Sequence, residues 1–289
     1  MSSAGGAVVC AAIFYLSAGF AAEAAGTNVE VGDSLLYQGG IVRVLVIDDA
    51  GLDTVTGSFM KKSLPFVPGP NGSFYTLAGV DLETRPGEYE LALKLVRRDG
   101  SSKNFSRRLR VADAHFPVQK LTLPPAQVFP DSAAQARIER EDELRNHRWT
   151  QWAGSAFWGK RFIVPVAGEM ARFGDRRIIN GASRSPHTGV DISAAEGAPV
   201  VAPAAGRVIL TGNFFFTGNS IYIDHGLGLI GMFFHLARID VREGEMVEQG
   251  QVIGAVGNTG RATGPHLHWG VRWRGARINP ASLLGLELD

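Results

Sequence analysis

Short runs of alternating apolar and polar residues recur between residues 27 and 112. IVRVLVID (41–48) and GEYELALKLVRRDG (87–100) are of this kind, and SRRLRVAD (106–113) ends the series. Because successive side chains of a strand point to opposite faces, each run predicts a strand with one buried face. Strands at a spacing of roughly ten residues, separated by Gly, Pro and Asn, predict a β-sandwich. We expect an accessory domain over residues 27–113 and find no catalytic cluster in it.

The pattern changes after this region. Four prolines lie in the stretch 117–130, and DSAAQARIEREDELRNHRW (131–149) is then rich in Ala, Glu, Arg and Leu. Asp131 can cap a helix made of such residues, and His147 falls near its end, where a cation suits the helix dipole. We expect a Pro-rich and helical linker over residues 114–152, with a single exposed helix.

The remainder, residues 153–289, returns to strand-length segments bounded by Gly, Pro or Asn. These segments are GVDISA, PVVAPAAGRVILTG, SIYIDHG, LIGMFFHL, MVEQGQVIGAVG and HLHWGVRW. No helix follows Gly254, Gly257 and Gly260, so tight turns explain these glycines better than a phosphate-binding loop. The chain is therefore predicted to be all-β, with a compact, turn-rich, antiparallel sheet domain in its second half.

The amino terminus carries an uncharged apolar run, AVVCAAIFYLSAGF (7–20), followed by Ala22-Glu23-Ala24. The run is short for a membrane span, and small residues around one position are typical of signal-peptidase cleavage. We expect residues 1–24 to be a signal peptide, so that the processed protein is exported to the periplasm or cell envelope and has no integral membrane span. No Lys or Arg precedes the run, which leaves an uncleaved anchor or a misassigned start as alternatives.

Cysteine content and charge limit the possible chemistry. The chain has one cysteine, Cys10, inside the expected signal peptide, and a net charge of +1. A processed chain would have no cysteine, which suits an oxidising compartment and excludes Cys-based metal sites and nucleophiles. The near-zero net charge predicts no nucleic-acid partner.

Five of the seven histidines lie between residues 187 and 268. On a strand, His266 and His268 would project to one face, with their Cα atoms about 7 Å apart. His187 precedes Asp191 by four residues in RSPHTGVDISA, where a loop leads into a strand. His187, Asp191 and one histidine of the 266/268 pair supply three zinc-type ligands, and three protein ligands leave a position open for catalysis.

These segments resemble one family of enzymes. RSPHTGVDI, IDHGLGL followed by HL, GQVIGAVGNTG and TGPHLHW are similar to the LytM/lysostaphin-type zinc metallopeptidases, over about residues 155–283. The resemblance implies an antiparallel β-sheet groove with one Zn²⁺ per chain on its floor. It implies His187, Asp191 and His268 as zinc ligands and His235 and His266 as the two catalytic histidines, without saying which is the general base.

Two neighbouring positions, His225 and Phe233, differ from these site residues in their expected roles. His225, in YIDHGLG, is predicted to be a structural residue at a hairpin turn, oriented by Asp224. Many relatives have Tyr where this chain has Phe233, so no phenol can assist the reaction from that position.

Export and the resemblance together predict an endopeptidase that cleaves peptide cross-links of peptidoglycan, with a D,D-endopeptidase as the expected form. The alternative is a non-enzymatic regulator that activates a cell-wall amidase, and degenerate relatives of that kind have lost the ligands present here. A peptidoglycan-binding or scaffold protein is a third class. The N-terminal region is further expected to be able to inhibit the groove intramolecularly, as upstream segments do in some relatives.

Overall fold

The computed structural model describes residues 26–122, 130–159 and 161–288. The expected signal peptide, with Cys10, lies outside the described residues. Within the described part of the chain, no helix is long and apolar enough to cross a membrane.

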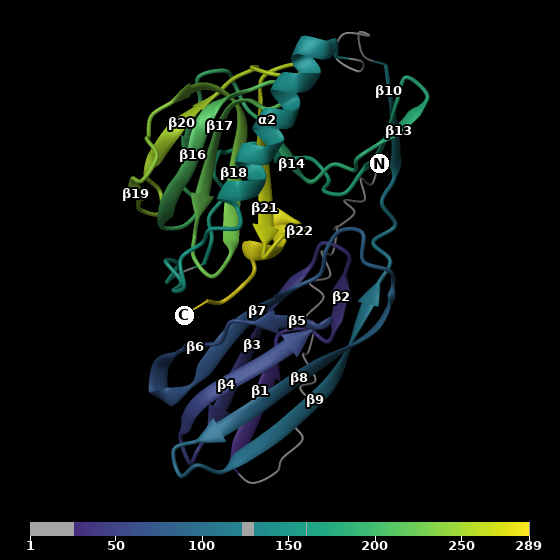
Figure 1. The fold of residues 1–289 in the computed structure, drawn as a ribbon. Coiled ribbons are helices and arrows are strands. Elements are labelled where there is room, and N and C mark those ends of the chain that lie inside the picture. The colour runs from purple at the N-terminus through teal and green to yellow at the C-terminus, as the bar shows by residue number, and fades with distance from the viewer. Residues whose placement is uncertain (1–25, 123–129, 160, 289) are drawn as a thin grey trace, which may run out of the picture.

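Two facing sheets form the amino-terminal part, at the bottom of Figure 1. One has the strand order β1 (Thr27–Val31), β3 (Ile41–Asp48), β7 (Phe74–Gly79) and β6 (Val67–Pro68). The other has the order β2 (Leu35–Tyr37), β9 (Ser102–Ala112), β8 (Gly87–Arg97), β4 (Leu52–Phe59) and β5 (Lys62–Leu64).

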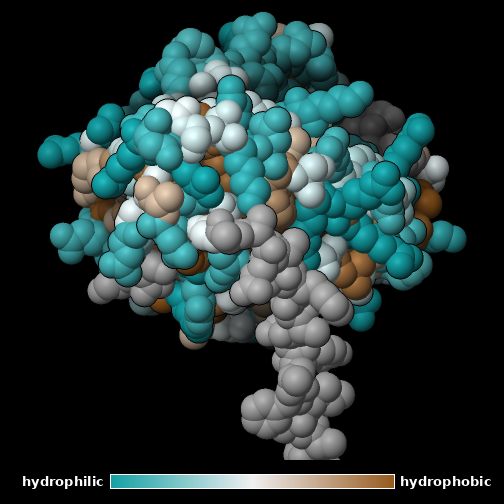
Figure 2. Space-filling model, turned by 90° about the horizontal axis from the view of Figure 1, so that it is seen from below, coloured by the Kyte–Doolittle hydropathy of each residue, from teal (hydrophilic) through white to brown (hydrophobic). Residues whose placement is uncertain are grey.

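The alternation of buried and outward-facing side chains along the strands explains how these two sheets pack. Leu91, Leu93 and Leu95 of β8 are buried in a shared cluster with Val44 and Val46 of β3, while the residues between the leucines face outward or are partly covered. The predicted β-sandwich is therefore confirmed. Seen from below, this end of the molecule is mostly hydrophilic, with apolar side chains scattered among polar ones (Figure 2).

A large antiparallel sheet forms the second half. Its main order is β11 (Glu169–Met170), β14 (Gly189–Ser193), β21 (His266–Trp273), β18 (Leu229–Ile239), β17 (Gly218–Asp224), β16 (Gly206–Phe214) and β19 (Met246–Val247). Three further strands join it: β15 (Pro199–Val201), β20 (Val252–Val256) and β22 (Ala276–Ile278). One face of β21 is apolar, because Leu267, Trp269 and Val271 are buried in the main core. The opposite face carries His266 and His268, as period-two alternation requires.

The linker does more than connect these two parts. Its first portion forms β10 (Val118–Leu121), which pairs in parallel with β12 (Arg176–Ile179), and β12 pairs in turn with β13 (Ala182–Arg184). Its second portion is the predicted helix, α2 (Ser132–Arg148), which Asp131 caps by accepting a hydrogen bond from the Ala134 N–H at 2.8 Å. His147 is exposed in the last turn of α2, as expected.

Helix α2 lies across the sheet near β16, toward the viewer in Figure 1. The Trp149 ring, just after the helix, meets the ring of Tyr222 edge-on at 6.4 Å, and the Arg145 guanidinium lies 5.7 Å from the centre of the Phe214 ring. The helix therefore covers part of the sheet face that also carries the clustered histidines.

The sandwich and the second half share one buried cluster. Ile41, Leu77 and Leu82 of the sandwich pack in the same core as Trp273. At Gly79 a Cβ atom would lie 2.8 Å from Cδ1 of Trp273, so this close approach requires glycine.

Charged groups reinforce the same contact. The Arg277 guanidinium donates to both oxygens of Asp81, at 3.0 and 2.6 Å, and also to Glu83. The pKa of Arg277 is raised chiefly by its hydrogen bond to Asp81, which keeps the guanidinium charged. The two parts are thus joined by an apolar contact with a hydrogen-bonded ion pair at its edge.

Candidate active site

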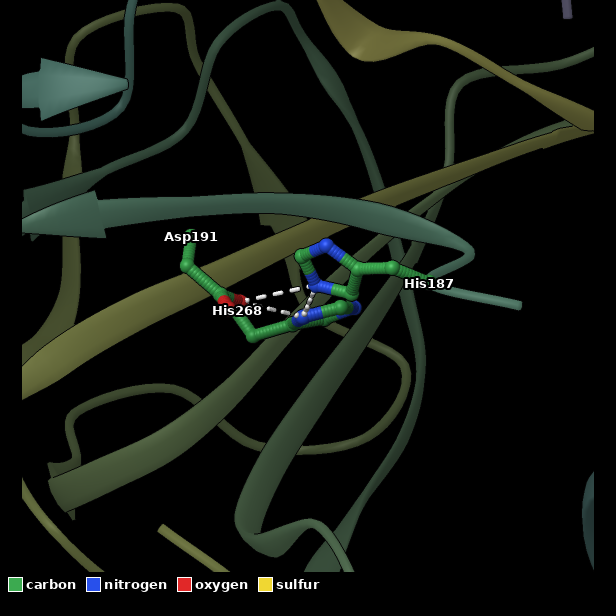
Figure 3. A group of neighbouring side chains, drawn as sticks. All are labelled: His187, Asp191 and His268. Carbon is green, nitrogen blue, oxygen red and sulfur yellow. Dashed lines mark hydrogen bonds and ion pairs between the residues drawn. The ribbon is translucent and has the colours of Figure 1, made fainter. Parts of the chain in front are cut away.

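Three side chains that could hold a metal converge where the loop before β14 meets the paired strands β14 and β21. The ligand atoms of His187, Asp191 and His268 all lie within 4.8 Å of one another. The structure pairs Asp191 directly with His268 across β14 and β21, and His187 lies in the loop that enters β14. Figure 3 shows the three side chains pointing toward one another from these two segments.

The distances describe a tight cluster around one carboxylate oxygen. Oδ1 of Asp191 lies 3.0 Å from Nε2 of His187 and 2.8 Å from Nδ1 of His268, and these two nitrogens are 3.1 Å apart. Two nitrogens and one oxygen facing a common point form the donor set that zinc accepts, and three such ligands leave a coordination position open. The residues present therefore fit a divalent metal.

The charge states also suit a metal ligand set. Burial raises the pKa of Asp191, but hydrogen bonds from His187 and His268 outweigh it and hold that pKa well below its usual range. Burial lowers the pKa of His268, which keeps its imidazole neutral at neutral pH. An ionised carboxylate and a neutral imidazole are the forms that bind a metal.

Surrounding groups hold these ligands in place. Nδ1 of His187 lies 3.2 Å from the Arg172 carbonyl oxygen, the kind of contact that orients a metal-binding imidazole. The Phe234 ring stacks on the His268 ring with 5.3 Å between centroids and an angle of 1° between planes. At Gly189 a Cβ atom would lie 2.5 Å from Nε2 of His268, so glycine is needed to leave room for this imidazole.

The other two predicted site residues, His235 and His266, stand beside the three. Their rings are 4.8 Å apart, and Nε2 of His266 lies 3.8 Å from Oδ1 of Asp191. Nδ1 of His235 is 2.8 Å from the Thr259 carbonyl oxygen, and Nδ1 of His266 is 2.8 Å from the Gly264 carbonyl oxygen. Each Nδ1–H can donate to its carbonyl, which leaves each Nε2 as the atom free to exchange a proton.

The backbone of His235 is unusual. Its φ is 64°, in the left-handed region, although the residue lies inside β18, where the pairing with β17 and β20 is irregular. Its N–H donates to the Thr217 carbonyl oxygen at 2.9 Å. Backbone strain of this kind costs about 1–3 kcal/mol and is concentrated at functional sites. Burial, followed by repulsion from His268, lowers the pKa of His235 to about 4, so its imidazole is neutral at neutral pH.

These groups border an open cavity of about 400 Å³. Its wall includes His187, His235 and His268 together with Arg177, Phe216 and Arg261. Every residue that lines it lies between 177 and 268, so the described residues of the sandwich contribute nothing to its wall.

Both portions of the linker support this wall. β10 pairs with β12, which carries Arg177, in the register Gln119 to Arg177. On α2, Glu141 accepts a hydrogen bond from the Phe215 N–H at 2.8 Å, beside Phe216 in the β16–β17 hairpin. The aromatic run Phe214–Phe216 both packs and lines the cavity, because Phe214 is buried and Phe216 lies in the cavity wall.

His225 and Phe233 lie away from the cavity. His225 is buried at the β17–β18 turn, with Nδ1 2.8 Å from the Ala205 carbonyl oxygen. The expectation that Asp224 orients it is wrong: the Asp224 carboxylate instead accepts the N–H groups of Ala153 and Gly226. Phe233 is fully buried in the main core.

Sequence reasoning missed Arg177, Phe234 and Arg261, which line the cavity. No spacing rule singles out Arg177 within RRII or Arg261 within a glycine-rich turn. Only the position of Phe234 next to His235 could have suggested that it lies near the site.

Comparison with known proteins agrees with this geometry. The family model of peptidase family M23 matches residues 185–280. A crystal structure assigned to peptidase M23 from Pseudomonas aeruginosa is 30% identical and has a TM-score of 0.64, covering 86% of this chain and 94% of that one. The chain belongs to peptidase family M23.

Curated relatives of the chain match over shorter segments. Peptidoglycan DD-endopeptidase ShyA of Vibrio cholerae is 40% identical over 130 residues, which are 45% of this chain and 27% of ShyA. DD-carboxypeptidase/endopeptidase Mpg of Neisseria meningitidis is 43% identical over 97 residues, which are 34% of this chain and 22% of Mpg. The match thus spans about a quarter of the length of these relatives.

Proposed function

We propose that this M23 peptidase is an exported zinc metalloendopeptidase that hydrolyses peptide cross-links of peptidoglycan, in the D,D-endopeptidase form. The observation that carries the proposal is the convergence of three ligand atoms beside two further imidazoles at an open cavity. ShyA and Mpg are named for D,D-peptidase activities, which supports the substrate class. Peptidoglycan lies outside the cytoplasmic membrane, so the proposal includes removal of residues 1–24 on export.

In this proposal His187, Asp191 and His268 hold one Zn²⁺. When bound, zinc supplies a Lewis acid that lowers the pKa of water and polarises the scissile carbonyl. Around it, the chain's own groups move the proton. The imidazoles of His235 and His266 keep Nε2 available for the reacting centre because Nδ1 faces a backbone carbonyl. The histidine that acts as general base accepts the proton of the attacking water at Nε2 and passes it to the leaving amine. The other can donate a hydrogen bond to the developing oxyanion when Nε2 also carries a proton, which requires the imidazolium form.

The experiment compares the processed chain with two variants, and measures both zinc content and release of peptides from purified peptidoglycan. His268→Ala should lose zinc and cleavage together, because it removes a ligand. His266→Ala should keep zinc and lose cleavage by roughly 100-fold or more, the usual effect of removing a general acid–base. His147→Ala, an exposed histidine on α2, is the matched control and should keep both.

The outcomes separate the alternatives. Zinc retained by His268→Ala would contradict the ligand set, and full cleavage by His266→Ala would contradict its catalytic role. Bound zinc without cleavage in the unmodified chain would favour another substrate or inhibition by the sandwich. Absence of both zinc and cleavage would favour the regulator of a cell-wall amidase.

A further inference from the structure

The cavity beside the five site residues has a positive wall. Two of its lining residues, Arg177 and Arg261, carry guanidinium groups, and no Asp or Glu is among the described residues that line it. Its other lining residues are apolar, hydroxyl-bearing or histidine side chains. A bound Zn²⁺ would add more positive charge than Asp191 neutralises, so the cavity favours an anionic group on its ligand.

The Arg177 backbone is held in a sheet, whereas its side chain has a nitrogen without a hydrogen-bond partner among the described residues. Its backbone is held by the β10–β12 pairing, and its side chain is 27% exposed, at the edge of the cavity. Nη2 lies 3.7 Å from Oδ2 of Asp191, which is an ion pair and too long for a hydrogen bond. Its Nε is buried and has no hydrogen-bond partner among the described residues. A guanidinium has five donors in a plane, and the four on its two terminal nitrogens are the ones that a ligand in the cavity can meet.

Asp191 forms an ion pair with Arg177 but does not accept a hydrogen bond from it. Its Oδ1 already contacts His187 and His268, and the shorter contacts in the cluster are all made by that oxygen. The guanidinium therefore lies close to the reacting centre, within reach of both the ligand cluster and the cavity.

Arg261 lies on a different part of the wall. Its backbone N–H donates to the Phe216 carbonyl oxygen at 2.9 Å, and its guanidinium carbon lies 4.4 Å from the centre of the Phe216 ring. Stacking on an aromatic ring restrains a guanidinium and keeps its positive charge at this part of the wall. The positive charge of Arg261 is thus held in place by the aromatic β16–β17 hairpin, which α2 supports.

We propose that Arg177 forms a carboxylate-binding subsite beside the scissile bond, with Arg261 as a second, outer cation. The inference rests on the proposed function and specifies its substrate: a cross-linked peptide with a free carboxylate on a residue next to the amide that is cleaved. A planar guanidinium can bind such a carboxylate through two parallel hydrogen bonds, which a carboxamide cannot replace. The subsite selects cross-links by charge and holds the peptide in register with the metal.

The test uses two synthetic cross-linked peptides that differ only in a carboxylate or a carboxamide next to the scissile amide. For the unmodified chain, kcat/KM should be higher for the carboxylate peptide. Arg177→Gln should lower kcat/KM for this peptide by roughly 10- to 100-fold, the effect of losing a charged hydrogen-bonding pair, and should change it little for the carboxamide peptide. Arg177→Lys should recover part of the preference, and Arg261→Gln should reduce it less than Arg177→Gln does.

A merely structural role predicts a different pattern. If Arg177 only positioned Asp191, Arg177→Gln would slow both peptides equally and lower zinc content, and the subsite would be overturned. No change with either peptide would overturn it as well.

A binding measurement keeps this inference separate from the proposed function. Calorimetric titration of both peptides is made on His266→Ala and on the same variant carrying Arg177→Gln. Tighter binding of the carboxylate peptide that disappears with Arg177→Gln supports the subsite even if no cleavage is seen. Equal or absent binding of the two peptides overturns it.

Discussion

Replacing His225 by Gln tests how the buried turn beside the main core responds to pH. The imidazole is 1% exposed and meets the Phe162 ring edge-on at 5.2 Å. Its Nδ1 faces the Ala205 carbonyl oxygen at 2.8 Å, and its Nε2 has no hydrogen-bond partner among the described residues. A Cβ at Gly231 would lie 2.8 Å from that Nε2, so a proton there would point into packed sheet.

The size of the change in the free energy of unfolding follows from the pKa of His225. Burial lowers the pKa of His225 from 6.5 to about 4, against a weaker opposing effect of the Ala205 carbonyl. The pKa of His225 is lower in the folded state than in the unfolded state. The stability that the neutral imidazole contributes is therefore present above pH 6.5 and is lost as the pH falls toward 4. At pH 5 the imidazole is almost fully protonated in the unfolded chain but only about one-tenth protonated in the folded chain. This difference lowers the free energy of unfolding by about 2 kcal/mol relative to pH 7.

The assay is urea unfolding of both proteins at pH 7 and pH 5, with a chelator present so that metal release does not contribute. The glutamine amide can still donate to the Ala205 carbonyl and does not titrate. Between pH 7 and pH 5, the free energy of unfolding should therefore fall by about 2 kcal/mol more in the unmodified protein than in His225→Gln. Equal losses in the two proteins would refute the reasoning, whatever the stability of the variant at pH 7.

Three other changes test the supports of the site. Gly189→Ala would place a methyl group 2.5 Å from Nε2 of His268 and should weaken zinc binding at least 10-fold by equilibrium dialysis, whereas an alanine at an open turn glycine should not. Glu141→Ala removes the acceptor of the Phe215 N–H and should raise KM several-fold with unchanged zinc content, while Glu141→Gln, which keeps an acceptor, should have a smaller effect. Arg277→Met removes the hydrogen-bonded ion pairs to the sandwich and should lower the free energy of unfolding, measured in urea, by about 1.5–3 kcal/mol, the usual range for hydrogen bonds to charged groups. Its cleavage rate should stay unchanged, and an increase would indicate intramolecular inhibition by the sandwich.

The parts of the site that sequence alone predicts are those set by local geometry. Alternation along HLHWGVRW places His266 and His268 on one face, and the structure has both on the face opposite Leu267 and Trp269. The all-β fold and the helix in the linker followed from periodicity and an Asp cap in the same way. The roles of His268 as ligand and of His266 as catalyst come from the family resemblance and remain a proposal.

Other features depend on contacts between segments far apart in the chain. The left-handed backbone of His235 depends on irregular pairing with two neighbouring strands, and nothing in FFHL indicates it. The parallel pairing of β10 with β12 joins residues more than fifty positions apart, in a stretch whose prolines suggested only a spacer. Propensity describes single segments, whereas pairing of this kind is decided by tertiary packing.

This pairing changes how inhibition by the amino-terminal region can be tested. A chain truncated to begin at residue 150 would lose β10, which supports the wall carrying Arg177, and α2, which holds the hairpin carrying Phe216. Its activity would fall because the groove had lost two supports, even if the sandwich normally blocked it. The two effects would act in opposite directions and could cancel. A change confined to the contact between the two parts, such as Arg277→Met in the intact chain, leaves both supports in place, so a change in rate reports on the sandwich alone.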